Sequence, residues 1–301
     1  MEQRCKVLIL GYGEMGHAME VLLKPRHDLL IWDKFPPPGF QSVELEPSVA
    51  VADIIIFCLP AQPHREVLDR VKPHLSAGSL CVSIAKGLDD RGACAAEVLQ
   101  AALDESAYAL LYGPMISEEI RSGRPAFAQV GCHGDSVYRR IQQLFHGSPL
   151  YLQQPRDITG ISWSVILKNV YAMVFGIADE LQLGDNMRGY LAVTALHELD
   201  RIVLAMGGQA YSPFSLAGLG DLITTATSED SHHHELGRML ARGETDNIIG
   251  EGVHTLQMVR QFGLVDITAY PLFGLIDSIV ENQHRTRQIM LDYLDSLSKR
   301  L

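Results

Sequence analysis

Cysteine is scarce in this chain, and its spacing is irregular. The five cysteines form no CxxC pair, and four of them lie in or beside apolar runs, as buried free thiols do. They are Cys5, Cys58, Cys81, Cys94 and Cys132. This pattern predicts free thiols in a reducing, cytoplasmic environment.

Positively charged residues are also few. The 25 lysines and arginines are outnumbered by 36 aspartates and glutamates, which gives a formal net charge of −11 and repels nucleic acid and anionic membranes. The apolar run near the N-terminus is too short for a signal sequence and leads into a glycine turn, and no other stretch is continuously apolar over the length of a membrane span. We expect no nucleic-acid partner, no export and no membrane span.

A glycine-rich turn dominates the beginning of the chain. The run KVLILGYGEMGHAMEVLL passes from a β-branched apolar pattern to helical spacing, and Gly11, Gly13 and Gly16 fit GxGxxG. The first glycine permits the turn, the second lets a pyrophosphate approach the backbone, and the third lets helix pack on strand. The helix N-terminus then offers free N–H groups to the phosphates.

A second strand pattern, HDLLIWD, ends in Asp33, about 20 residues beyond the motif, where an acid bonds the ribose 2′-hydroxyl of a dinucleotide. We therefore predict dinucleotide binding. The charge of Asp33 repels a 2′-phosphate and favours NAD, whereas the adjacent Lys34 keeps NADP open.

Further apolar runs alternate with helical segments up to Pro155. The expected strands cover 53–59, 79–84, 108–112, 126–130 and 149–152, and the expected helices include 62–75 and 92–103. This alternation predicts a mainly parallel, doubly wound sheet, whose ligands bind at the carboxyl ends of the strands. Lys86 follows one strand, where it is either a solvated surface lysine or a group facing the ligand.

Helical periodicity replaces the strand pattern after Pro155, so we expect a dinucleotide-binding domain at 1–155 and a helical substrate domain at 156–301. Lys168 and Asn169 lie within an apolar helix. Lys168 either snorkels to water or is buried, where its pKa falls into a range useful for proton transfer. Asp221, in LAGLGDLITTATS, is either a helix N-cap or a catalytic partner.

Together, these stretches resemble the bacterial NAD(P)-dependent glycerol-3-phosphate dehydrogenases over nearly the whole chain. The resemblance rests on GYGEMG, FCLPAQPHREVL, SIAKGLD, GPMISEEI, LKNVYAMVFGIADELQLGDN, GLGDLITTATS and EGVHT. The LKN and GLGDL elements, in this order after GxGxxG, are specific. The resemblance implies an N-terminal Rossmann domain, an all-α C-terminal domain, and the reversible reduction of dihydroxyacetone phosphate by a nicotinamide cofactor.

The resemblance also implies roles for single residues. Lys168 matches the general acid/base, while Asp221 and Thr225 match residues that hold and polarise the reacting centre; Lys86 completes the catalytic set. The cofactor contacts are Gly11, Gly13, Glu14, Met15, Gly16, Asp33, Pro60, Lys86, Ser117 and Glu251. The substrate contacts are Lys86, Gly113, Asn169, Thr225, Ser231, His232 and His233.

The chain departs from the family in its phosphate-binding segment. The family usually reads SRNRxxG where this chain reads SHHHELG, so histidines 232 to 234 replace two arginines and an asparagine. A histidine near neutral pH is mostly uncharged and offers fewer donors than an arginine. Met115 replaces a small hydroxyl residue, and Ser162-Trp163-Ser164 replaces an acid followed by glycines, which places a bulky indole near Lys168.

These departures keep several hypotheses open. The leading one is a dehydrogenase for glycerol 3-phosphate or a related small substrate. If His232 or His233 binds the anionic end of that substrate, we expect substrate affinity to rise as the pH falls through about 6.5. The alternatives are a dehydrogenase for a carboxylate-bearing substrate and a catalytically weak NAD-binding regulatory paralogue. A metal site at the histidines is disfavoured, because consecutive residues on a helix point in different directions, and we expect none. The family is usually dimeric, so we expect a homodimer.

Overall fold

Short runs of β-branched and other apolar residues form one seven-stranded sheet in the computed structural model, which describes residues 4–228 and 231–298. The strands are β1 (Lys6–Leu10), β2 (Asp28–Trp32), β3 (Ile54–Phe57), β4 (Leu80–Ser83), β5 (Tyr108–Tyr112), β6 (Ala126–Cys132) and β7 (Leu150–Gln153). Their order is β2-β1-β3-β4-β5-β6-β7, and all neighbours are parallel except β5 and β6. The predicted mainly parallel, doubly wound sheet is confirmed.

Helices cover both faces of this sheet, because alternate residues of each strand point to opposite sides. The helices of this part are α1 (Glu14–Leu23), α2 (Leu45–Val51), α3 (His64–Val71), α4 (Ala95–Ala102), α5 (Ser117–Arg121) and α6 (Asp135–Leu144). Val7 and Ile9 of β1 share a core with α1 and α6, whereas Leu8 and Leu10 share a core with α2, α3 and α4. The helix predicted at 62–75 ends early, since Pro73 turns its last part into a short 3-10 segment.

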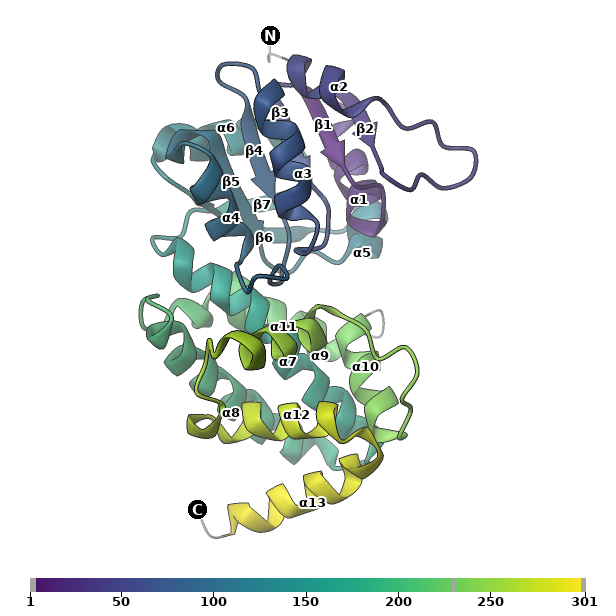
Figure 1. Ribbon diagram of the computed structural model, residues 1–301, viewed down its shortest axis with the longest axis vertical. Helices are drawn as coiled ribbons and strands as arrows, with labels where there is room; N and C mark the ends of the chain where they lie inside the picture. The colour runs from purple at the N-terminus through teal and green to yellow at the C-terminus, as the bar shows by residue number, and fades with distance from the viewer. Residues whose placement is uncertain (1–3, 229–230, 299–301) are drawn as a thin grey trace.

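The described residues after β7 form helices joined by loops, as predicted for the C-terminal part (Figure 1). They are α7 (Ile158–Glu180), α8 (Gly184–Ala205), α9 (Asp221–Thr227), α10 (His232–Ala241), α11 (Glu251–Phe262), α12 (Pro271–Glu281) and α13 (Thr286–Leu297). The helix α7 is long and apolar enough to cross a membrane, but its apolar window is entirely buried inside the protein, as in a core helix. Helices α8 to α12 pack against it, and α13 packs on α10 and α12 (Figure 1).

Asp157 holds the beginning of α7 in place. Its Oδ1 accepts a hydrogen bond from the backbone N–H of Gly160 at 2.8 Å, and its Oδ2 accepts from Gln209 N and Ser212 Oγ, each at 2.6 Å. The carboxyl ends of the parallel strands face the helical part, and their amino ends lie on the side away from it (Figure 1). Side chains of α7 and α9 therefore meet the loops that follow the strands.

Candidate active site

The glycine turn between β1 and α1 has the geometry that its sequence predicts. Gly11 adopts a φ of +93°, and a Cβ there would lie 2.5 Å from the carbonyl oxygen of Cys58. A Cβ on Gly16 would overlap the carbonyl oxygen of Gly11. A Cβ on Gly13, in contrast, would meet no described atom within 4 Å. Packing thus requires the first and third glycines, while the second leaves open space, and the pyrophosphate contact expected there stays a prediction.

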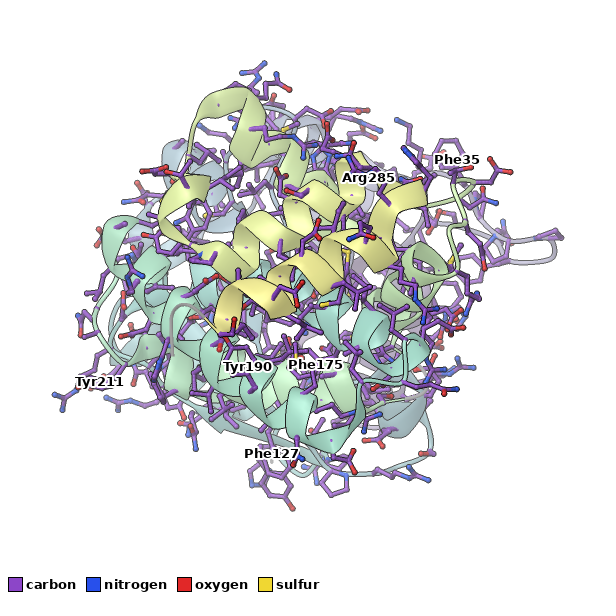
Figure 2. The ribbon with its side chains drawn as sticks, turned by 90° about the horizontal axis from the view of Figure 1, so that it is seen from below. Phe35, Phe127, Phe175, Tyr190, Tyr211 and Arg285 are labelled. Carbon is purple, nitrogen blue, oxygen red and sulfur yellow. The ribbon has the colours of Figure 1, made fainter. Side chains whose placement is uncertain are left out.

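Asp33 joins the end of β2 to this turn. Its Oδ2 accepts a hydrogen bond from Tyr12 N at 2.6 Å, and its Oδ1 accepts from Phe35 N at 2.7 Å. Each carboxylate oxygen has a second lone pair, so both can still accept from a ribose hydroxyl. Phe35, on the loop after Asp33, is 81% exposed and lies at the rim of the molecule (Figure 2).

Glu14 and Ser117 meet beside the glycine turn. Ser117 Oγ donates to Glu14 Oε2 at 3.2 Å, and Arg121 Nη1 donates to the same oxygen at 3.1 Å. Met15, the next residue, packs on the core formed by α1 and α6. Glu14 and Ser117, two of the predicted cofactor contacts, are therefore neighbours in space. Sequence reasoning did not identify Arg121, whose positive charge balances the negative charge of Glu14.

Two lysines share one carboxylate oxygen at the centre of the candidate site. Lys86 Nζ, after β4, lies 2.7 Å from Asp221 Oδ2, and Lys168 Nζ, in the middle of α7, lies 3.1 Å from the same atom. Lys168 also donates to Thr225 Oγ1 at 2.6 Å, and Thr225 donates to the carbonyl oxygen of Asp221 at 2.7 Å. The four predicted side chains come together.

These contacts decide between the alternatives that the sequence left open. Lys168 is only 4% exposed, and its Nζ is bonded inside the protein, so it does not snorkel to water. The N-cap of α9 is Gly220, and Asp221 uses its carboxylate on the two lysines instead. Lys86 is directed into the site, where it also donates to the carbonyl oxygen of Gly113 at 3.0 Å.

Burial controls the acidity of Lys168. Desolvation lowers its pKa from the ordinary lysine value to about 8; Asp221 opposes this shift by favouring the ammonium, and the charge of Lys86 adds to it. A lysine with this pKa can both donate and accept a proton near neutral pH. Two ammonium groups around one carboxylate also leave one positive charge, which can stabilise an oxyanion.

Asn169 and Glu251 connect the helical part to the sheet. Asn169 Nδ2 donates to the carbonyl oxygen of Lys86 at 2.9 Å, and Glu251, the first residue of α11, accepts from Ala61 N at 3.2 Å. A Cβ on Gly87 would overlap Glu251 Oε2, so the glycine permits this approach. Burial raises the pKa of Glu251.

Two oxygens of these residues remain available. Asn169 Oδ1 and Glu251 Oε2 are buried and make no hydrogen bond within the part of the chain that the structure describes. Buried polar atoms of this kind are rare unless a ligand or water satisfies them. Glu251 Oε2 and the open face of Gly13 fit a polar cofactor that spans the sheet and the helical part, and Asn169 Oδ1 is available to a substrate. Pro60, another predicted contact, is exposed near Ala61, and its carbonyl oxygen contacts His64 Nδ1 at 2.8 Å.

The three consecutive histidines point to three different partners. His232 Nε2 lies 2.8 Å from the carbonyl oxygen of Ile249, and His234 Nε2 lies 2.8 Å from Asp179 Oδ2. His233 Nε2 accepts from the backbone N–H of Gly252 at 3.3 Å. Among residues 4–228 and 231–298, no group of three or more histidine, cysteine or acidic side chains is arranged to hold a metal ion.

His233 carries no charge near neutral pH. Burial lowers its pKa well below the ordinary histidine value, and the neighbouring charges of Lys168, His232 and Lys86 lower it further. Because Nε2 accepts a hydrogen bond, the proton of the neutral ring is on Nδ1. The lowered pKa disfavours protonation of His233 near pH 6.5. The expected strengthening of anion binding by protonation of His232 or His233 stays a prediction.

Other residues of the altered segment have structural roles. Ser231 is the N-cap of α10, and its Oγ accepts from His234 N at 3.3 Å. Arg242, which follows α10, pairs with Glu180, Glu235 and Glu244.

Met115 and Trp163 are both buried, at 5% and 2% exposure. Trp163 lines a cavity of about 150 Å³ together with Tyr108 and His133. Five residues along a helix correspond to a rotation of about 140°, so Trp163 and Lys168 face different sides of α7. The sequence predicted that the indole of Trp163 lies near Lys168, but the indole lines this separate cavity instead.

The chain matches family models and solved structures over most of its length. Residues 34–137 match the model described as the NAD-dependent glycerol-3-phosphate dehydrogenase N-terminus, and residues 157–291 match the model of its C-terminus. A glycerol-3-phosphate dehydrogenase [NAD(P)+] of Agrobacterium fabrum is 30% identical over 93% of this chain and 94% of its own length. The counterpart from Teredinibacter turnerae is 29% identical over 86% of each chain. The crystal structure of glycerol-3-phosphate dehydrogenase from Coxiella burnetii has a TM-score of 0.85 at 23% identity, covering 97% of this chain and 99% of that one.

Proposed function

The chain belongs to the NAD-dependent glycerol-3-phosphate dehydrogenase family, and on this premise we propose that it interconverts glycerol 3-phosphate, or a close relative, and the corresponding ketone with Lys168 as general acid/base. It is an oxidoreductase that uses NAD or NADP and acts on a CH–OH group of a small molecule. The observation that carries the proposed mechanism is the sharing of Asp221 Oδ2 by Lys168 and Lys86.

The chemistry of this cluster suits the reaction. When bound, the reduced cofactor supplies a hydride to the carbonyl carbon. Lys168 Nζ donates its proton to the oxygen as negative charge develops there, and in the oxidative direction the neutral amine removes that proton. Asp221 and Thr225 orient the ammonium, because each bonds Nζ from a fixed position. Lys86 keeps a second positive charge beside the reacting oxygen.

We assign the cofactor to residues 1–155 and the substrate chiefly to 156–301. The glycine turn takes the pyrophosphate, and Asp33 takes the ribose and favours NAD over NADP. Glu14, Met15, Pro60, Ser117 and Glu251 complete the proposed cofactor set. Lys86, Gly113, Asn169 and Thr225 surround the substrate, and Ser231, His232 and His233 face its anionic end.

The exchange of arginine for histidine has a consequence for substrate affinity. His233 offers a single neutral donor, Nδ1–H, where the resemblance implies an asparagine, and His232 stands where it implies an arginine. A guanidinium binds phosphate with two charge-assisted hydrogen bonds, which an imidazole cannot match. We therefore propose that this protein binds the substrate phosphate more weakly than relatives whose segment reads SRNR. The relatives' names favour neither a carboxylate-bearing substrate nor a regulatory paralogue.

The test is NADH oxidation with dihydroxyacetone phosphate. The protein is expected to turn over this substrate, and Lys168→Ala is expected to lose at least about 100-fold in kcat while still binding NADH. Lys72→Ala, which removes an exposed lysine of the N-terminal part, is the matched control. Turnover that survives Lys168→Ala would exclude the assigned role, and NADH binding without turnover of the ketone would exclude the proposed reaction.

We further propose that the protein is a cytoplasmic homodimer. Large apolar side chains remain exposed on the helical part, among them Val193 and Leu204 of α8, at 57% and 46%. A second copy of the chain would remove them from water. Light scattering after size-exclusion chromatography measures the mass directly, and a monomer at micromolar concentration would contradict the proposal.

A further inference from the structure

A small cavity lies where α4 and β5 meet the beginning of α7. Its volume is about 150 Å³, and it is separate from the lysine cluster, because Trp163 and Lys168 face different sides of α7. The buried residues of its wall are Cys94, Ala96, Tyr108, Ser162 and Trp163. The exposed residues, which form its entrance, are Glu97, Gln100 and Thr159.

The indole N–H of Trp163 has no partner in this wall. The side chain is only 2% exposed, yet its Nε1 makes no hydrogen bond within residues 4–228 and 231–298. Protein atoms do not enclose this N–H completely, so it opens into the cavity that the indole lines. An indole nitrogen is a donor only, and a buried donor that finds no acceptor costs free energy. The group therefore calls for an acceptor from outside the chain.

Other polar groups of the wall are bonded within the protein. Tyr108 Oη lies 3.2 Å from His133 Nε2, and Ser162 Oγ donates to the carbonyl oxygen four residues earlier at 2.8 Å. Glu97 Oε2 accepts from Cys94 N at 2.8 Å. Each oxygen of a carboxylate accepts more than one hydrogen bond, so Glu97, at the entrance, can also accept from a ligand.

The wall carries no surplus of positive charge. Its lining residues, all in the described part of the chain, include no lysine or arginine. Burial raises the pKa of the Cys94 thiol to about 12 and raises the pKa of Tyr108, so both groups keep their protons. His133 Nδ1 lies 3.7 Å from Glu105 Oε2, which balances the imidazole when it is protonated. The carboxylate of Glu97 therefore disfavours an anionic ligand.

We propose that this cavity binds a neutral molecule of one planar ring, which accepts a hydrogen bond from Trp163 and donates one to Glu97. The volume suits a single ring, because an apolar cavity of about 150 Å³ in another protein binds benzene. The rings of Trp163 and Tyr108 offer aromatic contacts to such a molecule. A purely apolar ring would leave the indole N–H unpaired. The indole stands where the family usually has glycine, so the family does not imply this site.

Nitrogen-15 spectra of the indole N–H groups test the proposal, because the chain has two tryptophans, Trp32 and Trp163. The probe is 2-pyridone, whose ring carries a carbonyl oxygen beside an N–H. We expect a saturable downfield shift of the Trp163 proton, while the signal of Trp32 stays in place. Trp163→Phe assigns the two signals, and Trp32→Phe assigns them if the first variant does not fold. A Trp163 signal that 2-pyridone leaves unmoved would overturn the proposal.

Two further ligands separate recognition from size, with the Trp163 signal as the readout. Benzene lacks the acceptor and benzoate adds a negative charge, so each is expected to bind at least about 10-fold more weakly than 2-pyridone. A benzene affinity equal to that of 2-pyridone would overturn the role of the indole N–H, since only size would then be recognised.

A variant at the entrance tests the second hydrogen bond. Glu97→Gln keeps an acceptor for the N–H of Cys94 but removes the charge, and binding of 2-pyridone is expected to weaken roughly 3- to 10-fold. Glu44→Gln, at an exposed position before α2, is the matched control and should leave the affinity unchanged. Thermal unfolding checks both variants, and unaltered affinity in folded Glu97→Gln would contradict the proposed contact. None of these results depends on whether the protein reduces dihydroxyacetone phosphate.

Discussion

Lys168 Nζ lies 3.1 Å from Asp221 Oδ2, and both side chains are buried, at 5% and 4% exposure. A buried ammonium is costly unless it is paired. Here the pairing is incomplete, because Lys86 binds the same oxygen and weakens the hold of the carboxylate on Lys168. The arrangement keeps the lysine charged at neutral pH but leaves it able to release its proton.

The pH dependence of the two reaction directions should therefore be opposite. Reduction of the ketone needs the ammonium of Lys168, so kcat/KM is expected to fall as the pH rises through about 8, the pKa of this lysine. Oxidation of the alcohol needs the neutral amine, so kcat/KM is expected to rise through the same range. Initial rates measured in both directions between about pH 6 and 10 check this prediction, and identical profiles would contradict it.

Substitutions of the two neighbours should move this midpoint in opposite directions. Asp221 raises the pKa of Lys168 and Lys86 lowers it. Asp221→Asn is thus expected to shift the midpoint to lower pH, and Lys86→Met to higher pH. The residual activities are expected to be small, so the profiles are measured at high enzyme concentration. Shifts of the same sign would show that these charges do not act on Lys168.

The glycines of the turn should separate cofactor binding from folding. Gly13→Ala puts its methyl group into open space, so stability should change by less than about 1 kcal/mol, while NADH affinity falls as the methyl group meets the pyrophosphate. Gly16→Ala presses a methyl group on the backbone of Gly11, and a loss of roughly 1–3 kcal/mol in unfolding free energy is expected. Urea denaturation and NADH titration of both variants make the comparison. Unchanged NADH affinity in Gly13→Ala would argue against a pyrophosphate at this turn.

Asp33 is expected to set the preference for NADH over NADPH. Asp33→Asn removes the charge that repels a 2′-phosphate and weakens a charge-assisted bond to the ribose, so kcat/KM for NADH should fall by about 10-fold while that for NADPH is unchanged or higher. Since the carboxylate also accepts from Tyr12 N and Phe35 N, the melting temperature is measured in parallel. An unaltered ratio in a stably folded variant would remove Asp33 from cofactor selection.

Restoring the family's phosphate-binding pair should improve substrate affinity. The double variant His232→Arg/His233→Asn supplies a permanent charge, and KM for dihydroxyacetone phosphate is expected to fall by about 10-fold or more, with a smaller change in kcat. His74→Arg, at an exposed position of the N-terminal part, controls for the added charge. An unchanged KM in the double variant would place the phosphate elsewhere in the site.

Local sequence was sufficient for the strands, the glycine turn and the change to helices near Pro155. Strand runs and glycine spacing are read within a few residues, because backbone sterics and side-chain alternation act over that range. The same local reasoning identified Lys168, Lys86 and Asp221 as candidates. It did not reveal α2, whose seven residues include a proline and are too few to show a helical period.

The partners of these residues were decided by the tertiary structure. Lys86 and Asp221 are 135 positions apart, and only the packing of α9 against the loop after β4 makes them share an oxygen with Lys168. For the same reason the sequence left Asp221 open between helix cap and catalytic partner. The charge of His233 also depends on tertiary contacts, because burial and two lysines from other segments keep it neutral. The sequence determined which ionisable groups the site contains; folding determined their protonation, since a pKa depends on desolvation and on charges distant along the chain.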